Sequence, residues 1–352
     1  MTITRSQFGI IGSTPVEAFT ITNAHGLSAT VISYGARLTR MHVPDRNGIM
    51  ADIVLGFDDV ASYAASDTYF GATCGRYGNR IRDAQFVLDD QVVTVTANEK
   101  PNHLHGGEVG FDRRIWTATP SESDNSVTFT LLSANGEEGF PGQLIVTSTY
   151  RLTDDDRLII RMCGMTDQTT ILNMVHHSYW NLAGHSSGDV HKQWLVLEAD
   201  FYTPVDEQLI PTGEVLAVAG TPFDFRELKR IGEQISVVQN GGAGRLAGVG
   251  GGYDHNWVIR GNGLRPIATV YDANSGRELR MRATEPGVQL YTGGYLNTSV
   301  VGKNKQPYCR DAGFTLETQK FPNSPNFTHF ASTRLDPTKP YDHMMEITFT
   351  AH

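Results

Sequence analysis

The chain has 352 residues and a formal net charge of −9, with 39% hydrophobic and 19% charged residues. This balance is typical of a globular protein with a sizeable core. An acidic chain offers no basic surface for phosphates or an anionic membrane, so we expect neither nucleic acid nor a membrane as a partner.

Targeting and redox signals are weak. The sequence contains no run of roughly twenty apolar residues that could span a bilayer, and residues 1–6 lack the apolar core of a secretion signal. The three cysteines, Cys74, Cys163 and Cys309, are widely spaced and odd in number, which does not make a disulfide framework. We therefore expect a cytoplasmic protein.

The first predicted elements are short strands joined by turns. Residues 18–22 and 27–33 predict a hairpin around a turn at 23–26. The sequence Pro44-Asp45-Arg46-Asn47-Gly48 is a strong turn signal because Asn and Gly tolerate positive φ. That turn separates a strand over 38–43 from one over 52–55, and residues 58–65 predict one short helix.

The same alternation of short predicted strands and turns continues through the middle of the chain. Residues 127–132 predict a strand, and residues 143–152 and 158–165 predict a hairpin joined by 153–157. Leu144, Val146, Tyr150 and Leu152 share a parity, which indicates that one face of their strand is buried. Few windows have helical periodicity, so we expect an all-β protein, a large antiparallel sandwich with few short helices.

Glycines crowd residues 239–252. A phosphate-binding loop would need a Gly-Lys-Ser/Thr ending or a strand–Gly-x-Gly-x-x-Gly–helix context, and neither is present. We interpret the segment as a flexible connection rather than a nucleotide site.

The first polar cluster surrounds adjacent histidines, His176 and His177, in a segment that also contains Asn173, Tyr179 and Asn181. Side chains of neighbouring strand residues point to opposite faces, so one imidazole could be a satisfied core group and the other a functional one. Aromatic rings beside polar groups suit sugars, which have apolar C–H faces and a hydroxyl rim.

A second cluster contains His103 and His105, which share one face if the segment is extended, a spacing that suits metal ligands. Glu108 and the histidines at 176 and 177 invite comparison with a metal-binding cupin. The spacing to Glu108 is shorter than in that pattern, and we expect no metal.

A third cluster combines glycines with Asn79 and Arg80, whose guanidinium can form two hydrogen bonds to neighbouring hydroxyls. Asp254, Gln289 and Glu317 add acceptors and amides of the kind that line a polyol pocket.

Six blocks together resemble the aldose 1-epimerase (galactose mutarotase) family, in the family's order and across roughly residues 16–350. They are Gly75-Arg76-Tyr77-Gly78-Asn79-Arg80-Ile81, Leu104-His105-Gly106-Gly107 with Gly110-Phe111-Asp112, His177-Ser178-Tyr179-Trp180-Asn181-Leu182, Pro204-Val205-Asp206 through Ile210-Pro211-Thr212-Gly213, Tyr253-Asp254-His255-Asn256, and Leu316-Glu317-Thr318-Gln319. The resemblance implies a β-supersandwich forming a single domain over residues 1–352. It also implies interconversion of the α and β anomers of a free aldose without cofactor, by a monomer or homodimer.

Residue roles follow from the same resemblance. His177 corresponds to the general acid that protonates the ring oxygen, and Glu317 to the base that takes the proton of the C1 hydroxyl. The substrate-contacting set that it implies is Asn79, Arg80, His105, Asp254 and Gln289. This mechanism leads us to expect a protonated His177 facing an ionised Glu317 across the sugar. The histidine pKa would then lie near or above its ordinary value of about 6.5, with Asp254 as a neighbour favouring the cation.

The sequence departs locally from the family pattern at residues that would form the pocket walls. Trp180 replaces an expected phenylalanine and should keep an aromatic wall, while residues 322–326 and 333–343 also differ from the family pattern.

Two other classes of protein use similar residues. A glycoside hydrolase would pair Glu317 with Asp254 or Asp224, because such enzymes usually use two carboxylates. A carbohydrate-binding module without activity would use the same aromatic and amide groups.

Overall fold

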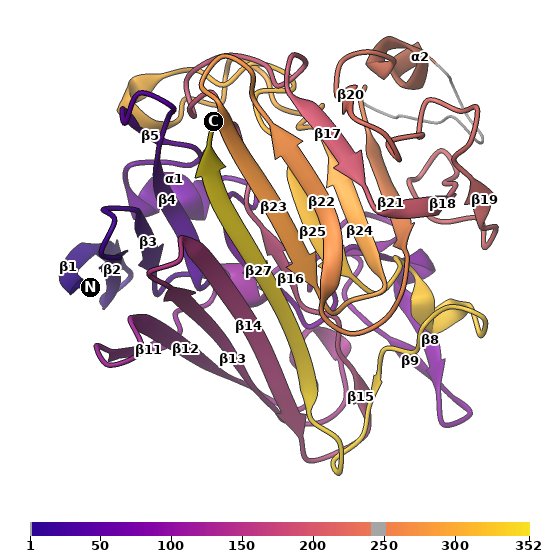
Figure 1. The fold of residues 1–352 in the computed structure, drawn as a ribbon. Helices are drawn as coiled ribbons and strands as arrows, with labels where there is room; N and C mark the ends of the chain where they lie inside the picture. Colours follow the sequence, from indigo (N-terminus) through magenta and orange to yellow (C-terminus); the bar gives the residue numbers. More distant parts are fainter. Residues whose placement is uncertain (1, 241–250) are drawn as a thin grey trace.

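The computed structural model describes residues 2–240 and 251–352, and most of the glycine-rich segment 239–252 lies outside the described residues. Antiparallel strands dominate the fold (Figure 1). Its described part has two short α-helices, α1 (Val60–Ala65) and α2 (Ile235–Asn240), which confirms the all-β prediction. Neither is long and apolar enough to cross a bilayer.

The largest sheet has nine strands in the order β11-β12-β13-β14-β27-β23-β22-β17-β20, and most of them lie in front in Figure 1. Their bounds are β11 Thr117–Ser121, β12 Ser126–Ser133, β13 Leu144–Leu152, β14 Arg157–Thr166, β27 Tyr341–Ala351, β23 Arg277–Ala283, β22 Arg265–Tyr271, β17 Trp194–Leu197 and β20 Lys229–Arg230. The last strand, β27, lies between β14 and β23 and so connects the two halves of the sheet. The four residues with shared parity on β13 are fully buried, as predicted.

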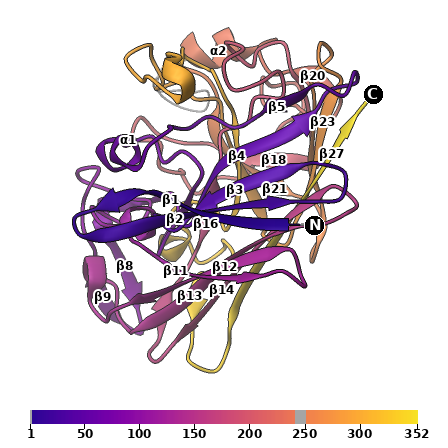
Figure 2. The same ribbon diagram turned by 90° about the vertical axis from the view of Figure 1, so that its left-hand side faces the viewer.

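The N-terminal residues form a five-stranded sheet of β1 Thr2–Ile11, β2 Thr14–Thr22, β3 Ser28–Ile32, β4 Arg37–Pro44 and β5 Met50–Asp52, which faces the viewer in Figure 2. The predicted hairpin corresponds to β2 and β3. The predicted helix over 58–65 begins only at Val60, because the side chain of Asp59 accepts a hydrogen bond from the Ser62 N–H (2.8 Å) and caps it there.

A second five-stranded sheet positions the site. It has the order β19-β18-β21-β24-β25, with bounds β19 Leu216–Ala217, β18 Ala199–Thr203, β21 Asp254–Ile259, β24 Gly287–Tyr291 and β25 Thr315–Gln319. One face carries Trp257, Leu290 and Leu316, which share a hydrophobic core with Val146 of β13 and Ile347 of β27. The opposite face is therefore left for polar groups.

Smaller elements complete the described structure. Four two-stranded pairs are β6 Ala72–Cys74 with β16 Val175–His177, β7 Arg80–Ile81 with β10 His103–Leu104, β8 Gln85–Leu88 with β9 Gln91–Thr94, and β15 Thr170–Ile171 with β26 Arg334–Leu335. Single 3-10 turns occupy Arg82–Ala84, Phe111–Arg113, Glu137–Gly139, Lys303–Lys305 and Ser324–Asn326.

A buried ion pair ties the connection between β24 and β25 to the N-terminal sheet. The fully buried Nζ of Lys303 donates to Asp52 Oδ2 (2.7 Å) and to the Val54 carbonyl (2.8 Å). Asp52 Oδ1 accepts a hydrogen bond from the Met41 N–H (3.0 Å). Burial lowers the pKa of Lys303 to about 8, partly opposed by Asp52.

Replacing Lys303 with methionine would leave the Asp52 carboxylate buried without its cation. We expect Lys303→Met to lower the free energy of unfolding by about 3–5 kcal/mol, measured by urea denaturation. As a control, Arg161→Met breaks a half-exposed pair with Asp342 (2.8 Å), which should cost about 1 kcal/mol or less. Equal losses in the two variants would contradict a structural role for the buried pair.

Candidate active site

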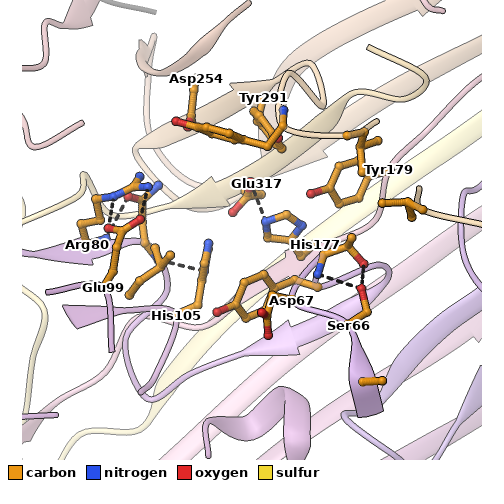
Figure 3. Close-up of a pocket in the computed structure, with 18 residues that line it drawn as sticks. Ser66, Asp67, Arg80, Glu99, His105, His177, Tyr179, Asp254, Tyr291 and Glu317 are labelled. Carbon is orange, nitrogen blue, oxygen red and sulfur yellow. Dashed lines mark hydrogen bonds and ion pairs between the residues drawn. The ribbon is translucent and has the colours of Figure 1, made fainter. Parts of the chain in front are cut away.

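A cavity of about 570 Å³ opens between the polar face of the second five-stranded sheet and the segments that contain His105 and His177 (Figure 3). This size is within the ~300–1,000 Å³ of ordinary ligand pockets. Six of the seven predicted site residues line it: Asn79, Arg80, His105, His177, Asp254 and Glu317. Gln289 is not among the lining residues.

Strand register brings Asp254 and Glu317 to the cavity. Asp254 of β21 lies opposite Tyr291 of β24, and Glu317 of β25 lies opposite Gln289 of β24. Residues two apart share a strand face, so these four side chains point to the same side of the sheet. Gln289 donates to Asp254 Oδ1 (2.7 Å) and accepts from Gln319 (3.3 Å), which places it behind Asp254.

The adjacent histidines point in opposite directions, as predicted, and both are buried. His176 bonds to Ser178 Oγ (2.7 Å) and Tyr150 Oη (3.2 Å) on the core side of β16. His177 faces the cavity, where its Nε2 lies 3.4 Å from Glu317 Oε1. The two groups are therefore neighbours, and the expectation that they face one another across a sugar ring was wrong.

The expectation that His103 and His105 share a strand face was also wrong. β10 ends at Leu104, and His105 adopts a positive φ of 50°. The His103 ring packs against Phe140, with Nδ1 2.8 Å from the Thr96 carbonyl, while His105 turns into the cavity. The next residue must be glycine, because a Cβ on Gly106 would lie 1.9 Å from a backbone oxygen.

His105, His177 and Glu317 form a cluster whose potential metal-ligating atoms all lie within 4.8 Å of one another. The hydrogen bonding of His105 does not suit an ion. Its Nδ1 accepts the Asn79 backbone N–H (3.2 Å), so Nε2 carries the proton and has no lone pair for a metal. His105 instead offers an N–H donor to a hydroxyl.

Arg80 is almost completely buried, and its ion pair with Glu99 could not be seen in the sequence. Its Nε and Nη2 donate to the two Glu99 oxygens at 2.6 and 2.7 Å. Although burial opposes the charge, this pairing raises the pKa of Arg80. The predicted two-pronged contact with sugar hydroxyls was wrong for this edge of the guanidinium, because Glu99 occupies it.

Tyrosines form the aromatic walls. The rings of Tyr69 and Tyr179 lie 5.7 and 5.2 Å from the His177 ring, and Tyr291 and Tyr295 line the cavity from the β24 side. Trp180, the expected wall residue, instead packs in the core against Phe349 (5.9 Å). Tyr291 lies two residues after Gln289 and so shares its strand face, a spacing that could have identified it as a site residue from the sequence. Nothing in the local sequence marked Tyr69 or Glu99 as site residues.

Burial sets the proton distribution of the central pair. It lowers the pKa of His177 to about 3 and raises the pKa of Glu317 to about 8, the latter against a hydrogen bond from Thr315 Oγ1 (2.9 Å). Asp254 has no part in the shift of His177. At neutral pH the imidazole is neutral and the carboxyl protonated, so the expectation of a histidine pKa near or above 6.5 was wrong.

Comparisons with known proteins identify the family of this chain. The aldose 1-epimerase family matches residues 17–348. Galactose mutarotase from Bos taurus is 39% identical, over 99% of both chains, and aldose 1-epimerase from Escherichia coli (strain K12) is 34% identical, over 96% of both. A crystal structure of galactose 1-epimerase from Lactobacillus acidophilus NCFM superposes with a TM-score of 0.87 at 27% identity, covering 100% of this chain and 99% of that one.

These matches define a carbohydrate isomerase with a galactose mutarotase-like β fold. The chain belongs to the aldose 1-epimerase family.

The tautomer of His105 predicts that activity does not depend on a metal. Prolonged dialysis against EDTA should leave the rate of anomer interconversion unchanged within error. A loss that Zn²⁺ restores would show that His105 can ligate an ion.

Proposed function

We propose that this chain interconverts the α and β anomers of free galactose- or glucose-type aldoses by acid–base ring opening and reclosure, without a cofactor. The observation that supports this most strongly is the buried His177–Glu317 pair, 3.4 Å apart in the cavity. The ring oxygen and the C1 hydroxyl are both bonded to C1. A sugar can therefore present both oxygens to two adjacent groups.

The pair needs one proton to run the reaction. Before opening, the proton of the pair passes from Glu317 to His177 across the 3.4 Å between them. Glu317 then takes the proton of the C1 hydroxyl while His177 gives its proton to the ring oxygen, and the C1–ring oxygen bond breaks to leave the aldehyde. His177 is then neutral and Glu317 protonated, which is the distribution that burial favours. After rotation about the C1–C2 bond, Glu317 returns its proton to the carbonyl oxygen and His177 removes the proton of the ring hydroxyl.

The remaining polar residues are proposed to hold the hydroxyls. His105 offers its Nε2–H, Arg80 offers the nitrogen not bound by Glu99, and Asp254 offers its carboxylate. Asn79 lines the cavity and fixes His105 through its backbone N–H. We assign Gln289 the task of orienting Asp254 through the 2.7 Å hydrogen bond rather than direct contact.

The two alternative classes gain no specific support. Asp224 pairs with Arg226 (2.8 Å) and does not line this cavity, so a hydrolytic pair would have to be Glu317 with Asp254. A binding module would not accelerate the spontaneous change in optical rotation of a fresh sugar solution, and a hydrolase would release a new reducing end from a glycoside.

Polarimetry of freshly dissolved α-D-galactose tests the assignment of the pair. We expect Glu317→Gln and His177→Asn each to lower kcat by on the order of 10²–10⁴-fold while sugar still binds, because each removes one proton-transfer group. Wild-type rates in either variant would remove that residue from the mechanism. Loss of sugar binding together with rate would show a role in binding instead.

The two pKa values predict the pH dependence. Between about 3 and about 8 the free enzyme holds one proton on the pair, and above about 8 Glu317 loses it. We expect kcat/KM to be level through neutral pH and to fall about tenfold per pH unit well above 8, as for any single ionisation. A profile that already falls above pH 6.5 would show that the proton is held by a histidine with its ordinary pKa.

We also propose that residues 1–352 act as one domain, as a monomer or homodimer in the cytoplasm. The three cysteines are all unpaired, which supports a reducing compartment. Analytical ultracentrifugation distinguishes the two assembly states.

A further inference from the structure

The charges around the cavity are unequal. Four carboxyl groups line it, those of Asp67, Glu99, Asp254 and Glu317, while Arg80 is the one Lys or Arg side chain among the described lining residues. Arg113 pairs with Asp67 Oδ1 (2.5 Å) at the rim, so with Glu317 protonated three carboxylates face two guanidinium groups. An anionic ligand would meet repulsion that a neutral sugar does not.

Arg80 is the group that could offset this repulsion, but Glu99 occupies its Nε–Nη2 edge and leaves only the remaining nitrogen for the substrate. Guanidinium binds carboxylate and phosphate most strongly through two parallel N–H donors. On Arg80 the Nε and Nη2 donors are both taken by Glu99, at 2.6 and 2.7 Å. The Glu99 side chain is 38% exposed and the Arg80 side chain 9%, so Glu99 lies on the solvent side of the pair.

We propose that Glu99 is a specificity-determining residue that restricts this pocket to uncharged aldoses. It does so by occupying the two-donor edge of Arg80 and by adding a negative charge to the cavity. Removing the Glu99 charge turns Arg80 into a receptor for an anionic aldose, one with a carboxylate or a phosphate in place of a hydroxyl. The inference rests on the proposed anomer interconversion, and it concerns substrate choice rather than the proton transfers.

The test compares neutral and anionic sugars on the same protein. For wild type, Glu99→Gln and Glu99→Ala, kcat/KM is measured by polarimetry with single anomers of D-galactose, D-galacturonate and galactose 6-phosphate. We expect the ratio of anionic to neutral kcat/KM to rise roughly tenfold or more in both variants, since one unit of opposing charge disappears in each and at least one of the two Arg80 donors is freed, both of them in Glu99→Ala. Using two variants protects the test against poor folding of one of them.

A matched control is Glu122→Gln, which makes the same charge change in the exposed turn between β11 and β12, away from the cavity. Its ratio should equal that of the wild type. A rise for either anionic sugar in the Glu99 variants alone supports the proposal. Unchanged ratios for both sugars, or an equal rise in the control, would overturn it. Wild type without activity on α-D-galactose would instead overturn the proposed function.

Discussion

Everything in this site depends on keeping an imidazole and a carboxyl group next to one another and away from water. In water at neutral pH the carboxyl group would be ionised and the imidazole only partly protonated. In the cavity, the loss of solvation disfavours both charges, and the proton moves to Glu317. The neutral arrangement is the one that follows ring opening, so the buried pair is suited to closing the ring on either face of the aldehyde.

The fold supports this pair through strand register rather than through loops. Glu317 is fixed opposite Gln289 in the middle of β25, the last strand of its sheet, and His177 belongs to a short strand that contacts β25. Groups held by hydrogen-bonded strands vary little in position, which favours proton transfer over short distances. The pocket walls are supported differently. Tyr295 and Leu296 belong to the connection between β24 and β25, and Lys303 in the same connection binds Asp52 of the N-terminal sheet through its ammonium group.

Much of the fold was visible in the sequence, because alternation and turn chemistry are local signals. The strands around 143–152 and 158–165 match β13 and β14 within one residue at either end, and the buried parity on β13 was confirmed. The helix at 58–65 was misplaced at its start only, where the cap formed by Asp59 decides the boundary.

Site geometry was harder to predict, because it depends on single backbone angles and on contacts between distant residues. No sequence pattern predicts that the chain leaves β10 at His105 with a positive φ. The pairing of Arg80 with Glu99 and the packing of Trp180 against Phe349 join residues well separated in the chain. The proton distribution was predicted wrongly because ordinary pKa values describe groups in water, and a sequence does not say how deeply a group is buried.

The position of β27 has a consequence for biosynthesis. These eleven residues, Tyr341–Ala351, fill the gap between β14 and β23 in the middle of the largest sheet. While the ribosome still holds them, the two flanking strands have no partner between them, and each presents an open edge to other chains. The largest sheet therefore stays incomplete, with two open edges in its middle, until residues 341–351 are free to insert.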